Sequence, residues 1–184
     1  LSVESGGNSF MEIGPGGGIL TLLLRAKGFD VITCDINRDL NPAVSINLPS
    51  LPFRSKAVSV VLCFEVLEHM PFEFLLPSLH ELKRVAANKV IISLPNCRSF
   101  LEEPNKYSVS WVAKWFRRLI FSIRLFMMGN VEPNIAPEHF WEIGAHNISV
   151  DTVIEQAKLV GLFPIENFRN PYCPYHHFFI FNVD

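Results

Sequence analysis

A glycine-rich turn is the stretch of this chain whose residue types could do chemistry. Gly14, Gly16 and Gly18 follow an apolar run at residues 10–13 and precede a leucine-rich stretch at residues 19–27. Glycines allow positive φ angles and let a ligand approach the main chain closely. A glycine turn between a buried strand and the start of a helix is a nucleotide-binding device of doubly wound α/β folds. The stretch therefore predicts a site for a nucleotide cofactor.

The spacing of the glycines and two acidic residues narrow the choice of nucleotide. A dinucleotide fingerprint reads Gly-x-Gly-x-x-Gly, and its third glycine would fall where this chain has Ile19. Glu12, inside the expected first strand, suits a ligand with a cationic group better than a pyrophosphate. Asp35 ends the next apolar run, where a carboxylate can bind ribose hydroxyls. A nicotinamide-dependent oxidoreductase is the alternative, and Ile19 argues against it.

Five short motifs follow one another along the first half of the chain. They are Glu12-Ile13-Gly14-Pro15-Gly16-Gly17-Gly18, Asp35, Leu51-Pro52-Phe53, Glu65-Val66-Leu67-Glu68-His69 and Ser93-Leu94-Pro95-Asn96. In order and spacing the chain resembles class I S-adenosylmethionine-dependent methyltransferases, most closely the group that includes the ubiquinone and menaquinone biosynthesis enzymes. The motifs cover residues 8–97, and the rest of the chain is similar only in the order of its expected strands.

The resemblance implies an α/β fold with a Rossmann-like, doubly wound, mostly parallel sheet. Its strand order would be 3-2-1-4-5-7-6, with the last strand antiparallel and a helical insertion after strand 5. We expect a single methyltransferase domain over residues 1–184, in which the aromatic-rich insertion at residues 98–147 forms a lid over the acceptor. The hydrophobic patterns predict helices at 19–27, 71–87 (with Pro77 in the first regular turn) and 150–160, and strands at 10–13, 30–35, 44–46, 57–64, 89–94, 162–168 and 176–183.

The resemblance also implies S-adenosylmethionine as cofactor and S-adenosylhomocysteine as product. Glu12 would support the glycine loop and the cofactor's ammonium group, and Asp35 would take the ribose hydroxyls. Asn47 stands near the place of an adenine-binding acid, and its amide oxygen could accept the same hydrogen bond or simply belong to a turn. The residues implied for cofactor binding are Glu12, Gly14, Pro15, Gly16, Gly18, Asp35, Ile36, Asn47, Leu48, Leu51, Phe64 and Glu65.

Two histidines are candidates for a general base. His69 follows the fourth expected strand, at the end of the sheet where ligands gather, and imidazole titrates near neutral pH. His139 lies in an aromatic loop that could fold over the pocket. The alternatives are structural, with His69 pinning the following helix and His139 packing against Trp141. His176 and His177 are adjacent on a strand, so they point to opposite faces, and we expect both to be structural.

Composition excludes several classes of function. The chain has 184 residues, 49% of them hydrophobic and 18% charged, which is enough apolar material for a large core. The net charge of −2 gives no electrostatic case for binding nucleic acid. The four cysteines form no C-x-x-C pair, so we expect reduced thiols in a cytoplasmic protein and no metal site.

The residues after the fourth expected strand constrain the acceptor. Enzymes that methylate nucleobase amines typically carry an Asn- or Asp-Pro-Pro-aromatic run there, whereas this chain reads Cys63-Phe64-Glu65-Val66. A small or lipid-like acceptor, methylated at oxygen or carbon, is therefore expected.

Residues 108–128 have the pattern of a basic amphipathic helix, which could be part of the lid or make a peripheral contact with an anionic membrane. The alternative function is a catalytically inactive methyltransferase-like module that binds a partner or such a membrane. Because the chain begins without Met and almost directly on its first expected strand, we also expect it to be a fragment of a longer protein.

Overall fold

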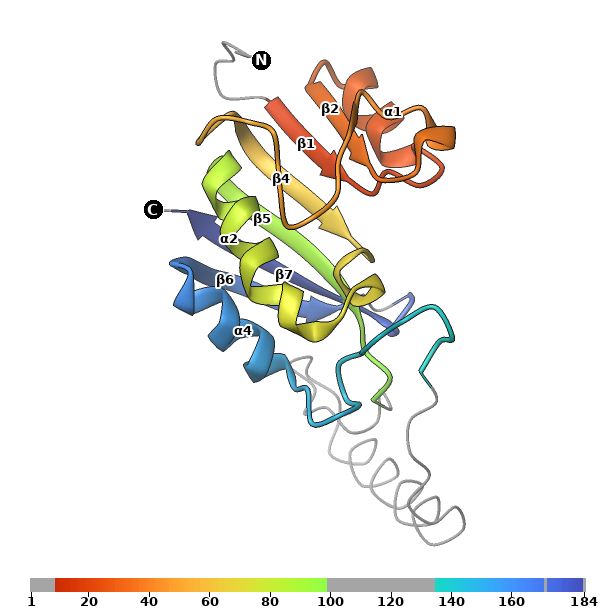
Figure 1. The fold of residues 1–184 in the computed structure, drawn as a ribbon, viewed down its shortest axis with the longest axis vertical. Helices are drawn as coiled ribbons and strands as arrows, with labels where there is room; N and C mark the ends of the chain where they lie inside the picture. Colours follow the sequence, from red (N-terminus) through yellow and green to blue (C-terminus); the bar gives the residue numbers. More distant parts are fainter. Residues whose placement is uncertain (1–8, 99–134, 171, 184) are drawn as a thin grey trace, which may run out of the picture.

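A seven-stranded sheet organises the chain (Figure 1). The computed structural model describes residues 9–98, 135–170 and 172–183. The strand order is β3-β2-β1-β4-β5-β7-β6, with β1 to β5 parallel and β7 antiparallel to both of its neighbours. The predicted order and the antiparallel last strand are confirmed. The strands are β1 (Ser9–Ile13), β2 (Asp30–Asp35), β3 (Val44–Ser45), β4 (Val58–Phe64), β5 (Ala86–Pro95), β6 (Leu162–Arg169) and β7 (His176–Val183).

Helices and short 3-10 turns connect the described strands. The helices are α1 (Ile19–Ala26), α2 (Leu75–Val85) and α4 (Val150–Leu159), and the 3-10 turns are η1 (Arg38–Leu40), η2 (Leu67–His69) and η3 (Phe72–Phe74). In Figure 1, α2 and α4 lie side by side over the part of the sheet formed by β4, β5, β7 and β6. Ser149 and Thr152 form a reciprocal capping box at the start of α4, and this box fixes where the helix begins.

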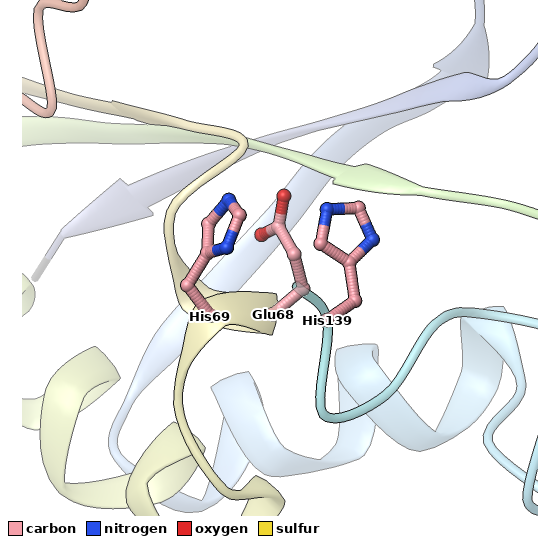
Figure 2. Close-up of side chains that lie close together, drawn as sticks. All are labelled: Glu68, His69 and His139. Atoms are coloured by element: carbon pink, nitrogen blue, oxygen red, sulfur yellow. The ribbon is translucent and has the colours of Figure 1, made fainter. Parts of the chain in front are cut away.

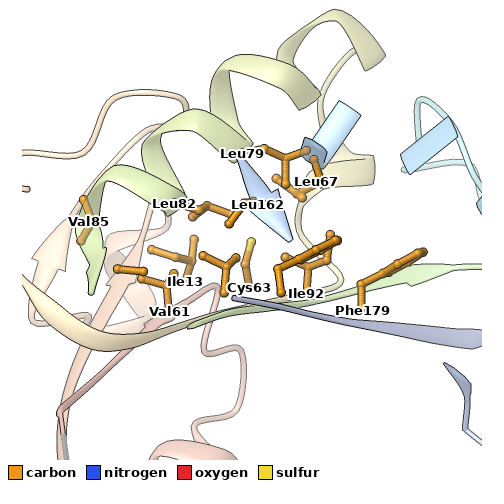
Figure 3. Close-up of a cluster of buried hydrophobic side chains, with 14 of the residues drawn as sticks. Ile13, Val61, Cys63, Leu67, Leu79, Leu82, Val85, Ile92, Leu162 and Phe179 are labelled. Atoms are coloured by element: carbon orange, nitrogen blue, oxygen red, sulfur yellow. The ribbon is translucent and has the colours of Figure 1, made fainter. Parts of the chain in front are cut away.

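The core lies between α2 and the central strands (Figure 3). Leu79, Leu82 and Val85 form the apolar stripe of α2 and are fully buried, facing Val61 and Ile92 of the sheet. The near-continuous apolar sequence of β4 fits this burial, because the strands of a parallel sheet are covered on both faces. All four cysteines are free, and burial raises the pKa of the Cys63 thiol.

Both predicted ends of the second helix are wrong, and so is the predicted start of the strand that follows it. The helix expected at residues 71–87 begins at Leu75, and Ala86 already belongs to β5, where it pairs with Val58 of β4. Pro71 takes an extended conformation and a 3-10 turn follows it, so the regular helix starts later. Pro77 consequently falls in the first helical turn, where its missing N–H is not needed.

The insertion expected at residues 98–147 lies mostly outside the described residues, which resume at 135. The predicted basic helix at residues 108–128 falls entirely outside them. Among the helices that are described, none combines the length and the apolar character that a bilayer crossing would require.

A buried histidine joins the carboxyl end of β5 to β6 and β7. His177 is 3% exposed, and its Nδ1 lies 3.2 Å from Asn96 Nδ2 while its Nε2 lies 3.1 Å from Asn167 Oδ1. Because the Oδ1 of Asn96 accepts from the Arg98 N–H, its amide nitrogen is the donor to His177. The ring is therefore neutral with the proton on Nε2. Burial, helped by the charge of Arg169, lowers the pKa of His177 to about 4.

This network predicts a specific loss of stability in acid. The folded-state pKa of His177 lies below its ordinary value of 6.5, so the neutral ring stabilises the fold fully above pH 6.5 and the contribution is lost as pH falls toward 4. Between pH 7 and pH 5 the free energy of unfolding should fall by about 2 kcal/mol more in the wild type than in His177→Gln. Urea unfolding at both pH values measures this difference. His80→Gln, which removes an exposed histidine of α2, should behave like the wild type.

Candidate functional site

A cavity of about 520 Å³ opens at the carboxyl ends of β1, β2 and β4. The chain leaves β1 toward β2 and leaves β4 toward β5, so the cavity lies where the strand order reverses. Ligands of open α/β sheets bind at this kind of switch point. The lining residues are Ile13, Gly14, Asp35, Ile36, Ile46, Asn47, Leu48, Pro49, Val66, His69, Met70, Pro71, Phe74 and Phe140.

The glycine loop forms one wall of the cavity and is shaped by a close approach. Gly14 has a φ of +70°, and a Cβ built on it would lie 2.3 Å from Cγ2 of Val66. Its N–H donates to the Cys34 carbonyl at 2.9 Å, which ties the end of β1 to β2. Gly16 and Gly18 also have positive φ, and a Cβ at either would meet nothing within 4 Å. Gly14 therefore exposes its backbone to the cavity at a place where any other residue type would put a side chain against Val66.

Asp35 supplies the carboxylate of the cavity. It ends β2, and one of its oxygens accepts the Asn37 N–H at 2.8 Å, which holds the side chain at the rim. Ile36 beside it is 65% exposed, although it is large and apolar. Asn47 and Leu48, just after β3, face the same space. A carboxylate that can accept hydrogen bonds from two hydroxyls, next to exposed apolar side chains, suits a ligand in which a sugar diol is joined to a flat ring system.

Several residues expected in the cofactor site brace it instead of lining it. Glu12 is 5% exposed and accepts a hydrogen bond from the Thr21 hydroxyl, which fixes α1 against β1. The Leu51 N–H donates to Glu81 of α2, so this residue anchors the segment that follows β3. Pro15, Gly16 and Gly18 shape the glycine loop, but within the described part of the chain the lining of the cavity does not include them.

Phe64 and Glu65 lie at the end of β4 but turn away from the cavity. The Phe64 ring packs edge-on against Phe178 of β7, with centroids 5.6 Å apart. Glu65 accepts from the Ser93 hydroxyl at 2.7 Å and pairs with His176 Nδ1 at 3.0 Å. Strand alternation explains the orientation of Phe64, because Cys63 faces the core and its neighbour must face the other side of the sheet. Glu65 follows the end of β4 and has a φ of +51°, so alternation does not apply to it.

The two candidate bases lie next to each other although they are far apart in the sequence. The Phe140 N–H donates to the Glu68 carbonyl at 2.8 Å, and this bond holds the loop after residue 134 against η2. The rings of His69 and His139 are 4.8 Å apart and nearly perpendicular. Of the two, His69 lines the cavity. The expected structural alternative for His139 is packing against Trp141. In the structure the His139 ring packs edge-on against His69 and its Nδ1 lies 2.8 Å from Glu142, while the Trp141 ring packs on Phe72.

Glu68 lies between the two imidazoles (Figure 2) and was not singled out from the sequence. It is 0% exposed, and neither of its carboxylate oxygens has a hydrogen-bond partner among the described residues. Burial raises the pKa of Glu68 to about 8, with Glu65 and Glu142 adding to the effect. The available signal was a second acid in the turn Glu65-Val66-Leu67-Glu68-His69, but the other histidine of the cluster, His139, comes from a distant loop.

Glu142 holds that loop together. It is 0% exposed, and its Oε1 accepts from the Tyr175 hydroxyl at 2.7 Å and the Ala136 N–H at 3.0 Å. His139 Nδ1 lies 2.8 Å from the same oxygen. Burial, together with the bond to Glu142, raises the pKa of Tyr175.

Part of the apolar cavity wall, beyond the expected Ile36 and Leu48, was also missed in the sequence. Val66, Met70 and Phe74 come from the segment after β4, and Phe140 comes from the loop beside it. No periodic pattern marks these residues, because they lie in turns.

A second hollow of about 690 Å³ lies against α2, lined by residues that include Leu76, His80 and Val160. Its polar side chains serve the fold, since Arg84 donates to Glu81 and to the carbonyls of Leu51 and Phe53. The cavity at the strand ends is therefore the candidate site.

Comparison with known proteins gives a family and a fold. Residues 3–150 match the model of a family described as methyltransferase domain. No curated protein matches the chain. Among solved structures, the chain is similar to the PH0226 protein from Pyrococcus horikoshii, with a TM-score of 0.63 and 18% identity over 96% of this chain and 82% of that one.

Two similar structures were solved with S-adenosylhomocysteine bound. Magnesium protoporphyrin IX methyltransferase from Synechocystis has a TM-score of 0.63 and 14% identity, covering 97% of this chain and 75% of that one. The 1,6-didemethyltoxoflavin-N1-methyltransferase from Burkholderia thailandensis has a TM-score of 0.61 and 11% identity, covering 96% and 72%. At these identities the likeness shows a shared Rossmann-like fold.

Substituting Gly14 tests the close approach that shapes the loop. Gly14→Ala should lower the free energy of unfolding by about 1–3 kcal/mol, because a side chain at positive φ is strained and its methyl group would overlap Val66. Gly17→Ala is the matched control, since a Cβ there meets nothing within 4 Å and its φ is not positive. Adding Val66→Ala to Gly14→Ala should recover part of the loss. Equal stability of the Gly14 and Gly17 variants in urea titrations would contradict the geometry.

Proposed function

The chain belongs to the methyltransferase domain family, and from this premise we propose that it transfers the methyl group of S-adenosylmethionine to a small or lipid-like acceptor. S-adenosylhomocysteine is then the product. The observation that carries the proposal is the cavity at the β1/β4 switch point, which combines the bare backbone of Gly14 with the carboxylate of Asp35.

The residues present fit this cofactor. Backbone freed of side chains at Gly14 lets the methionine portion approach the loop, and Asp35 can accept hydrogen bonds from both ribose hydroxyls. Ile36 and Leu48 offer apolar surface for the adenine, and Asn47 offers an amide for its edge. The other residues expected at the cofactor then support the site through the loop and the strand ends that they hold. They are Glu12, Pro15, Gly16, Gly18, Leu51, Phe64 and Glu65.

Positioning is the main work of the protein in such a reaction. When bound, the cofactor supplies a methyl group already activated by its sulfonium. Holding an acceptor in line with that group can provide about 7–11 kcal/mol of the barrier. Met70, Phe74 and Phe140 form an apolar wall that suits a largely hydrocarbon acceptor and excludes water. We favour oxygen or carbon as the methylated atom because residues 63–66 lack the Pro-Pro-aromatic run of nucleobase enzymes.

His69 is the candidate general base. Its Nδ1 lies 3.2 Å from the Glu138 carbonyl, so that nitrogen carries the proton and Nε2 keeps a lone pair beside the cavity. His139 stands behind it, with its own Nδ1 held by Glu142. A base at this place would take the proton that a hydroxyl or acidic carbon loses on methylation.

Calorimetric titration with S-adenosylmethionine and S-adenosylhomocysteine tests the cofactor site. We expect micromolar dissociation constants, and Asp35→Ala should weaken both by more than tenfold, because two hydrogen bonds to an ionised carboxylate are lost. Asp39→Ala, an exposed acid of η1 close by, is the matched control and should bind like the wild type. If Asp35→Ala retains wild-type affinity while remaining folded, the ribose does not bind where we place it.

A further inference from the structure

Burying the Glu68 carboxylate costs free energy, and no role in cofactor binding accounts for it. It is completely buried and lacks a hydrogen-bond partner among the described residues, and two other carboxylates, on Glu65 and Glu142, lie close enough to oppose its charge. Buried carboxylates are normally paired or bound to a metal ion, because an uncompensated charge is expensive in an apolar surrounding. No Lys or Arg side chain pairs with it among the described residues, so either a bound proton or a cation must neutralise it.

Each of the two histidines beside Glu68 is held in a tautomer that leaves one ring nitrogen able to bind a metal ion. His69 directs Nδ1 to the Glu138 carbonyl at 3.2 Å, and His139 directs Nδ1 to the Glu142 carboxylate at 2.8 Å. Each of these oxygens is an acceptor, so each Nδ1 carries the proton and each Nε2 keeps its lone pair. Metal-binding histidines are held in this way, with the second ring N–H donated to a carbonyl or a carboxylate.

We propose that Glu68, His69 and His139 form a binding site for a divalent first-row transition-metal ion. One donor atom from each of the three side chains lies within 4.8 Å of the others, and Figure 2 shows the carboxylate between the two rings. In a tetrahedral site, metal–ligand bonds of about 2.1 Å place two donors about 3.4 Å apart, so each of the three side chains would move toward the ion by less than about 1 Å. Two imidazoles with one carboxylate suit Zn²⁺, Mn²⁺ or Fe²⁺ better than Mg²⁺ or Ca²⁺.

The site would join the two walls of the cavity. Glu68 and His69 belong to η2, whereas His139 belongs to the loop that also contributes Phe140 to the lining. These segments are already linked by the bond from the Phe140 N–H to the Glu68 carbonyl, by the contact of His69 Nδ1 with the Glu138 carbonyl and by the bond from Trp141 Nε1 to the Met70 carbonyl. A cation here neutralises the carboxylate cluster and fixes the loop beside the acceptor wall. In the metal-loaded chain both Nε2 lone pairs are ligands, so His69 and His139 would not serve as bases.

The test uses the whole chain, stripped with a chelator and titrated separately with Zn²⁺ and Mn²⁺ in the absence of S-adenosylmethionine. We expect one ion to bind per chain by calorimetry, and either ion to raise the midpoint of thermal unfolding. Glu68→Gln preserves the shape but removes the charge, so it should weaken binding at least tenfold and abolish the thermal shift. His139→Gln should do the same and provides a second variant should Glu68→Gln fail to fold.

Surface chelation is excluded by a matched control. The double variant Glu73→Gln/His80→Gln removes one exposed acid and one exposed histidine from the neighbouring η3 and α2. It should bind and respond to metal like the wild type. Absence of stoichiometric binding by both ions, or equal affinity in wild type and Glu68→Gln, would overturn the proposal. Because no cofactor is present, a failure of the proposed methyltransferase function leaves this result unaffected.

Discussion

The close contact between the end of β1 and the segment after β4 is the constraint on which the site depends. These strands are parallel neighbours, yet the chain leaves them in opposite directions along the sheet, which opens a cavity between their carboxyl ends. Val66 fills the position that a side chain at residue 14 would occupy. Only glycine is compatible with that contact and with the positive φ, so the same residue closes the core below and leaves bare backbone toward the cavity.

The order of the elements, and the positions of Gly14 and Asp35 at the cavity, could be predicted because their signals are local. Gly14 and Asp35 each end a strand of apolar residues, and the end of a strand is visible in the sequence. Phe64 and Glu65 were expected at the cofactor for the same reason, but alternation along β4 turns Phe64 toward Phe178, and Glu65 finds Ser93 and His176. Which face a strand-end residue takes depends on neighbouring strands that lie far away in the sequence.

The carboxylate–histidine cluster could not be predicted at all from the residues around Glu68. A turn that reads Glu-Val-Leu-Glu-His has no ligand spacing of its own, and the third side chain comes from position 139. The cluster exists because Glu142, inside the core, gathers Tyr175, Ala136 and His139 on one oxygen. Such a network depends on tertiary packing, so cysteine and histidine spacing alone suggested that no metal site was present.

If a cation binds as we propose, the acceptor and the ion would compete for Nε2 of His69, and this competition would decide how the proposed reaction is assisted. A histidine that binds a cation through Nε2 cannot remove a proton with it, whereas a bound cation lowers the pKa of an oxygen acid that coordinates to it. Assistance through His69 alone favours any acceptor with a weakly acidic hydrogen. Assistance through a cation favours an acceptor whose own oxygen can reach the ion past Phe140. The choice of acceptor and the charge state of the buried Glu68 are therefore linked through His69.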